Sequence, residues 1–182
     1  LIDDVPIEQY DIHHLRSRVV MVDQHTVLFN ASIRDNIAYG TNATDSEIIQ
    51  ALKDAKIWEF VEKEPDQLLS VLQEGGSNLS GGQRQRPGLA RALYRLADTY
   101  LLDDPLSAVD AHVGAHIMDF ILDFVRRERR TIIMPCHQLH FLRHADLIVT
   151  LADSTICEMG TFDTLMGAGK EFSSLMEKHS AA

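Results

Sequence analysis

The 182-residue sequence predicts an α/β fold built on a largely parallel sheet. Short apolar runs rich in β-branched residues alternate along the chain with segments whose apolar residues recur at helical spacing. Strands that alternate with helices are typical of a parallel sheet covered by helices. The composition, 45% hydrophobic and 24% charged, is that of a globular protein, and the length corresponds to about one domain.

Three runs have the pattern of strands buried on both faces, because nearly every residue in them is apolar. These strands are expected at residues 18–22, 99–102 and 131–134. A hairpin is expected near the C-terminal end, where residues 146–151 and 155–158 flank Asp153 and Ser154. Asp and Ser favour the tight turn that joins two antiparallel strands.

Helices are expected where apolar residues recur every three or four positions. They cover residues 32–38, 45–55 and 83–96, a segment after Asp110, and two short segments that close the chain. Asp110 is a typical N-cap, and the helix after it ends in the basic cluster RRERR, which suits the negative end of the helix macrodipole. Residues 78–82 indicate a Gly-rich loop. About residues 29–96 carry almost no strand pattern, so we expect a helical subdomain inserted into the sheet domain.

The charge and cysteine content exclude several classes of protein. Against 17 basic residues there are 27 acidic ones, a net charge of −10, which disfavours a surface for nucleic acid. The two cysteines, Cys136 and Cys157, make no disulfide framework and fit a reducing compartment. No apolar run approaches the ~20 residues of a membrane helix, and there is no signal-peptide pattern. The sequence begins at Leu1 rather than Met, so we expect a piece of a longer polypeptide.

Residues 79–83, LSGGQ, are a candidate phosphate-binding segment at the start of an expected helix. Gly81 and Gly82 would let a phosphate approach the backbone closely, and the helix N-terminus offers unpaired N–H groups. The Ser80 hydroxyl adds a donor. Taken alone, Ser80, Gly81 and Gly82 favour the alternative of a simple glycine turn with Ser80 as the N-cap.

Polar residues also follow the expected strands. Asp103 and Asp104 come directly after the strand at residues 99–102, at the carboxyl edge where α/β proteins bind ligands. An Asp at this position can hold Mg²⁺, and the next acid can polarise an attacking water. Gln24 and His137 follow the other two strands. Solvated turn residues and a structural histidine are the alternative interpretation.

A zinc site is a further, less favoured alternative. His137, His140 and His144 recur at i, i+3 and i+7, but no Cys or acid nearby is evident as an additional ligand.

Taken in order, these features resemble the ATP-binding domain of ABC transporters. LSGGQRQR resembles the family signature, YLLDD the Walker B strand, and SAVD, which ends in Asp110, the D-loop. Gln24 resembles the Q-loop glutamine and His137 the switch histidine. The resemblance covers nearly all of residues 1–182 and implies a P-loop NTPase-like, mostly parallel sheet with an inserted helical subdomain. LLDDPLSAVDAHVGAHI is similar to the first ATP-binding domain of the multidrug-resistance-associated exporters.

One motif of the family has no counterpart in the sequence. No segment matches G-x-x-x-x-G-K-[ST], the P-loop that cradles the phosphates. We therefore expect the N-terminal strands and the P-loop to lie upstream of this chain.

The resemblance implies Mg²⁺-dependent ATP hydrolysis that powers substrate export across a membrane. It assigns Gln24 and Asp103 to Mg²⁺, Asp104 to the attacking water and His137 to the γ-phosphate. The resemblance also implies that four signature residues contact ATP held by a second ABC ATP-binding domain, which packs head to tail against this one. Asp110 would carry signals across that dimer. These signature residues are Ser80, Gly81, Gly82 and Gln83. The implied cofactors are ATP and Mg²⁺. The implied partners are the second domain and the transmembrane domains, without nucleic acid, at the cytoplasmic face of a membrane.

Several residues depart from the family pattern. Asp104 replaces the usual catalytic Glu, Pro87 stands within the signature helix, Pro135 precedes the switch histidine, and Ser154 replaces a usual Gly in the hairpin turn. These departures favour an alternative in which the chain is the catalytically degenerate, regulatory half of an asymmetric transporter. A soluble ABC-type ATPase of DNA maintenance and a truncated gene product without activity are two further alternatives.

Overall fold

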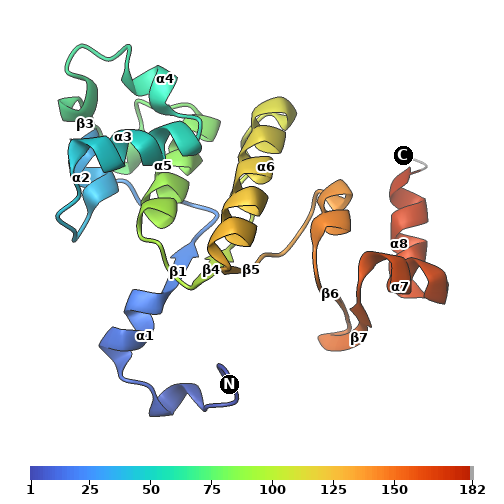
Figure 1. Cartoon of the computed structure of the whole chain (residues 1–182). Coiled ribbons are helices and arrows are strands. Elements are labelled where there is room, and N and C mark those ends of the chain that lie inside the picture. The colour runs from blue at the N-terminus through green and yellow to red at the C-terminus, as the bar shows by residue number, and fades with distance from the viewer. Residues whose placement is uncertain (181–182) are drawn as a thin grey trace. The chain divides into compact units, whose positions relative to one another are not determined.

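The computed structural model describes residues 1–180 and contains two compact units. The first unit covers Leu1–Pro135 and the second begins at Cys136 (Figure 1). The first unit holds a three-stranded and a two-stranded sheet, and the second holds a two-stranded sheet of its own.

The first unit is built on a three-stranded parallel sheet in the order β1-β4-β5. Its strands are β1 Val19–Val22, β4 Thr99–Leu102 and β5 Thr131–Ile133. This confirms the three strands predicted from the apolar runs and the parallel sheet that they imply. The predicted burial on both faces is wrong for the two outer strands, since Met21 on β1 and Ile133 on β5 are each 60% exposed. Strand β4 lies in the centre, with Val22 beside Leu102 in the pair with β1. The carboxyl ends of β1 and β4 therefore lie next to each other.

Helices make up most of the rest of this unit. They are α1 Ile12–Arg18, α2 Ile33–Ala38, α3 Asp45–Asp54, α4 Trp58–Val61, α5 Gly81–Tyr94 and α6 Ala111–Glu128. Three 3₁₀ turns, η1 Ile7–Gln9, η2 Gln67–Leu69 and η3 Glu74–Gly76, and a two-residue antiparallel pair, β2 Ala31–Ser32 with β3 Val71–Leu72, complete it. The expected helices are all present. The pair β2–β3 was not predicted, because strands of two residues leave no periodic pattern.

The predicted loop at residues 78–82 is wrong at its C-terminal end. Helix α5 begins at Gly81, so Gly81 and Gly82 form its first turn. The reason is the capping box: Ser80 Oγ accepts from the Gln83 N–H at 3.3 Å, and Gln83 Oε1 accepts from the Ser80 N–H at 2.9 Å. Two satisfied N–H groups stabilise a helix start even where its first residues are glycines.

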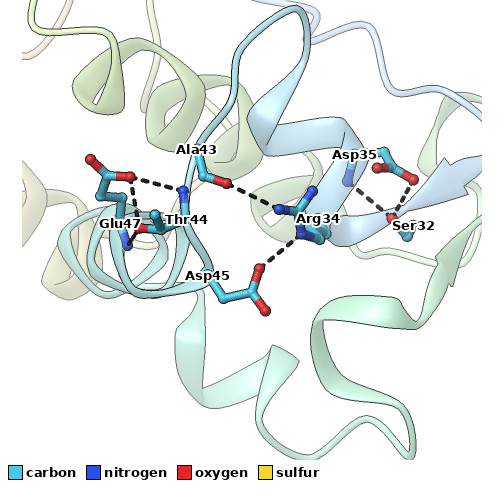
Figure 2. A network of polar contacts seen from close by, with 7 residues as sticks. All are labelled: Ser32, Arg34, Asp35, Ala43, Thr44, Asp45 and Glu47. Atoms are coloured by element: carbon cyan, nitrogen blue, oxygen red, sulfur yellow. Dashed lines mark hydrogen bonds and ion pairs between the residues drawn. The ribbon is translucent and has the colours of Figure 1, made fainter.

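Side-chain caps also begin α1, α2, α3 and α6, whereas α4 begins without one. Thr44 and Glu47 form a second capping box at α3, and Ser32 caps α2 by accepting from the Asp35 N–H (Figure 2). Arg34 joins these two helix starts, since it donates to Asp45 at 2.8 Å and to the Ala43 carbonyl at 3.0 Å (Figure 2).

The second unit contains η4 Leu139–His144, an antiparallel hairpin of β6 Ile148–Ala152 and β7 Thr155–Gly160, and helices α7 Phe162–Ala168 and α8 Glu171–Ser180. The hairpin prediction is confirmed, and both turn residues have positive φ, 48° at Asp153 and 61° at Ser154. A small core of Ile148, Phe162, Leu165 and Phe172 joins the hairpin to the two helices.

Candidate functional site

The candidate site lies at the carboxyl edge of the sheet of the first unit. Asp103 follows β4 directly, and its N–H donates to the Val22 carbonyl at the end of β1 at 2.8 Å. Gln24 comes two residues after β1, and its side chain and that of Asp103 are both exposed. The structure thus brings an amide and a carboxylate to one edge of the sheet, as the sequence predicts.

Asp104 begins a tight turn that leads away from β4. Its φ is +45°, in the left-handed region, which Asp tolerates better than most residues. The carbonyl of Asp104 accepts from the N–H of Ser107 at 3.3 Å and from its Oγ at 3.2 Å, which closes the turn. The Asp104 side chain is half-buried beside the exposed Asp103. The two acids therefore stand in different surroundings on one edge.

The N-terminus of α5 supplies a second group of donors. Within residues 1–180, the N–H groups of Gly81 and Gly82 have no hydrogen-bond partner. This is expected, because the first N–H groups of a helix have no acceptor within the helix. Ser80 Oγ uses a lone pair in the capping box and keeps its proton to donate, and Gln83 keeps its NH₂ group. Ser80 is therefore an N-cap, and the helix start still presents donors.

A half-buried arginine lies behind this helix start. Arg86 Nε donates to the Gly82 carbonyl at 3.0 Å, and the guanidinium also donates to the Lys56 carbonyl. Burial lowers the pKa of Arg86, whereas the carboxylates of Asp110 and Glu59 raise it. Asp110 caps α6 as predicted, since its Oδ1 accepts from the Val113 N–H at 3.0 Å.

His137 belongs to the second unit, whereas Gln24, Asp103 and Asp104 belong to the first. Helix η4 begins only at Leu139 and has 3₁₀ geometry, so His137, His140 and His144 do not share the α-helical face on which the zinc alternative depends. In the described part of the chain, no group of three or more His, Cys, Asp or Glu side chains is arranged to hold a metal ion. An ion held at Asp103 and Gln24 would need oxygen ligands from its substrate and from water, as Mg²⁺ commonly does.

One polar residue at this edge was missed by the sequence analysis. Gln85 on α5 is 8% exposed and hydrogen-bonds to the segments that follow β1 and β4. The sequence did contain a pattern that could have indicated Gln85. It is a polar residue on an otherwise apolar helix face, and Gly82 and Gly88 lie three residues before and after it.

Among residues 1–180, the structure contains no helix with both the length and the apolar character needed to span a bilayer.

Comparisons with known proteins agree with the resemblance seen in the sequence. The family model described as ABC transporter matches residues 1–107. The chain is 39% identical to an ATP-dependent lipid A-core flippase of Alcanivorax borkumensis over 168 residues. This matched region covers 91% of this chain and 28% of the flippase. The chain is 40% identical over 161 residues to ATP-binding cassette sub-family C member 2 of Homo sapiens, which covers 87% of this chain and 10% of that protein.

A solved structure is similar over the same extent. A bacterial Atm1-family ABC exporter with ATP bound superposes with a TM-score of 0.86 at 29% identity, which covers 93% of this chain and 30% of the exporter chain. This confirms the predicted fold class. The chain spans less than a third of the length of each of these proteins.

Proposed function

The chain belongs to the ABC transporter family, and from that premise we propose that it is part of the ATP-binding domain of an exporter, where ATP hydrolysis drives a substrate across a membrane. The observation that carries the proposal is the edge of the sheet at which Gln24, Asp103 and Asp104 follow two adjacent parallel strands. The proteins that the chain is similar to are named as a flippase, a sub-family C cassette protein and an exporter.

Asp103 and Gln24 are the residues that would hold Mg²⁺. A carboxylate and an amide oxygen are ligands that this ion accepts, and both side chains are exposed at the edge. When bound, Mg²⁺ neutralises the charge that develops on the phosphates during phosphoryl transfer. With only two protein ligands, the ion depends on substrate oxygens for the rest of its coordination, so these residues would bind it together with ATP.

Asp104 would orient and polarise the attacking water. Its carboxylate is half-buried at the edge of the sheet and can accept a hydrogen bond from water. His137 is the proposed contact to the terminal phosphate, because it comes four residues after the end of β5, the third strand of the sheet.

Ser80, Gly81, Gly82 and Gln83 would bind ATP held by a second ABC domain. The support is the pair of unpartnered glycine N–H groups together with the Ser80 hydroxyl and the Gln83 amide at the positive end of α5. Asp110 would carry the signal between the two domains. The remaining proposed partners are transmembrane domains, which would hold this domain at the cytoplasmic face of a membrane.

A second candidate function is that of a regulatory half that binds nucleotide and hydrolyses it slowly. The observation that favours it is Asp104, whose side chain is one methylene shorter than the glutamate that the resemblance leads us to expect. A shift of ~1 Å in a catalytic group can lower a rate on the order of 10²-fold.

ATP hydrolysis by the full-length polypeptide that contains this chain, reconstituted in lipid vesicles, tests the proposal. We expect Mg²⁺-dependent hydrolysis that Asp103→Asn lowers by about 100-fold or more, since the neutral amide loses the charge that holds the ion. Asp119→Asn, an exposed position on α6, is the matched control and should retain the wild-type rate. A wild-type protein without Mg²⁺-dependent hydrolysis, or an Asp103→Asn variant with full activity, would contradict the proposal.

A further inference from the structure

We propose that Gln85 is a positioning residue that holds together two segments: the one after β1, which carries Gln24, and the turn after β4, which begins at Asp104 and leads to Asp110. The inference rests on the proposed function, because these segments carry its site residues. Gln85 lies on α5 and acts through its neighbours rather than on a reacting group.

The side-chain amide of Gln85 has a partner at both polar atoms. Its Nε2 donates to the Gln24 carbonyl at 3.2 Å and to Ser107 Oγ at 2.8 Å, and its Oε1 accepts from the Ala108 N–H at 3.0 Å. Because a carbonyl can only accept and a backbone N–H can only donate, these partners fix which way round the amide lies. The Gln85 side chain is 8% exposed, so these three hydrogen bonds are made by a buried amide, and an apolar replacement would remove all of them.

Two further hydrogen bonds extend this arrangement in both directions. The carbonyl of Gln85 accepts from Thr26 Oγ1 at 3.2 Å, which adds a second contact to the segment after β1. Ser107 Oγ donates onward to the Asp104 carbonyl at 3.2 Å. One residue of α5 is therefore bonded to the segment after β1 and to the turn after β4.

Two glycines on the same face of α5 make this close approach possible. A Cβ added at Gly82 would lie 2.8 Å from the Ala108 carbonyl oxygen, and one added at Gly88 would lie 2.2 Å from Thr26 Oγ1. Both distances are shorter than carbon–oxygen contact allows. Gly82, Gln85 and Gly88 are spaced three residues apart on the helix. The face that presents the Gln85 amide therefore also has two positions without side chains, where the two segments can pack closely.

A positioning role affects the rate of hydrolysis more than the affinity for ATP. The turn that begins at Asp104 is held by two hydrogen bonds from Ser107 to the Asp104 carbonyl and, through Ser107 and Ala108, by Gln85. Without the amide, the turn and the segment that carries Gln24 can move independently. A displacement of ~1 Å at a catalytic carboxylate lowers turnover on the order of 10²-fold, whereas contacts to nucleotide made elsewhere stay intact.

The test compares variants of the full-length polypeptide in lipid vesicles. Gln85→Met replaces the amide with an apolar chain of similar length, and Gln85→Glu keeps its shape but cannot donate to the Gln24 carbonyl. For both we expect kcat of Mg²⁺-dependent ATP hydrolysis to fall about 10-fold or more, with KM for ATP within about 3-fold of wild type. Gln50→Met is the matched control, because Gln50 is exposed and its amide donates to Asp54 on its own helix.

A milder variant keeps the inference open to contradiction if Gln85→Met fails to fold. Ser107→Ala removes the link to Asp104 at an exposed position, and we expect a smaller fall in kcat that does not add to the effect of Gln85→Met. Wild-type kcat in Gln85→Met, or in Ser107→Ala where the former does not fold, overturns the inference. Wild-type protein that hydrolyses no ATP overturns the proposed function, and the inference with it.

Discussion

Asp104 is the residue that we propose to polarise the attacking water, so the expected rate depends on it most directly. Its carboxylate is one methylene shorter than that of the expected glutamate, yet its φ of +45° suits Asp better than Glu. The short side chain therefore matches the local backbone while it increases the distance to a reacting water. Backbone preference and catalytic reach act in opposite directions at this position.

We accordingly expect Asp104→Glu to raise ATP turnover of the full-length polypeptide about 10-fold, because the longer side chain restores the reach of the base. The melting temperature should fall slightly, since Glu is less tolerant of positive φ. Steady-state hydrolysis and a thermal melt measure the two effects. Asp119→Glu on α6 is the control. Unchanged turnover in a folded Asp104→Glu protein would show that the length of this side chain does not limit the rate.

Helix α5 is the element that connects the site with the core. Its buried face includes Leu89 and Leu93, and its N-terminal turns carry the signature residues. Pro87 lies in its second turn and is buried. Because proline has no N–H, the Gln83 carbonyl loses its helical partner, and the ring crowds the preceding turn.

Replacing Pro87 therefore offers a stability test at the scale of this helix. Pro87→Ala should stabilise the chain by about 1–2 kcal/mol, because the restored N–H and the relief of crowding exceed the loss of the buried ring. Pro87→Ile should give a smaller gain, since the larger side chain must fit a buried position. The midpoint of urea unfolding measures both, with Pro65→Ala in an exposed loop as the control. A lower midpoint for Pro87→Ala would contradict this account of α5.

The elements also show what the sequence predicts well. Caps at Ser80 and Asp110 and the apolar stripe of α6 have short-range causes, so the residues alone indicated them. The carboxyl-edge position of Gln24 and Asp103 followed from the expected parallel strands. Gln85 could not be assigned in this way, because its partners lie 22, 23 and 61 residues away in the sequence. Contacts of that range depend on how helices pack on the sheet.

At the scale of the first unit, Asp98 connects all three strands at the edge opposite the site. Its carboxylate pairs with Arg18 at 2.8 Å, before β1, and with Arg130, before β5. Its backbone joins the same neighbours, since its N–H donates to the Arg18 carbonyl and its carbonyl accepts from the Thr131 N–H, each at 2.9 Å. The Arg130 side chain is only 25% exposed, so it depends on this partner more than a surface arginine would.

Asp98→Ala should destabilise the chain by about 1–2 kcal/mol, because it removes two ion pairs and leaves a partly buried guanidinium without its carboxylate. Asp45→Ala removes a single, more exposed pair with Arg34 and should cost about 0.5 kcal/mol or less. Urea unfolding at low and high salt distinguishes the two variants. Added salt should reduce the loss of unfolding free energy only in part for Asp98→Ala, because that ion pair is partly buried. Equal costs for the two variants would mean that Asp98 does no more than a surface ion pair.

The central claim is that this chain contributes to two ATP sites. Asp103 and Gln24 would hold Mg²⁺ at one site, and the N-terminus of α5 would contact ATP at the other. An electron cryo-microscopy structure of the full-length protein carrying Asp104→Asn, prepared with ATP and Mg²⁺, tests it most directly. We expect the ion at Asp103 and Gln24, and the N-terminus of α5 against nucleotide bound by a second ABC domain. Nucleotide-bound protein with the ion away from Asp103, or with residues 80–83 facing solvent, would contradict the claim.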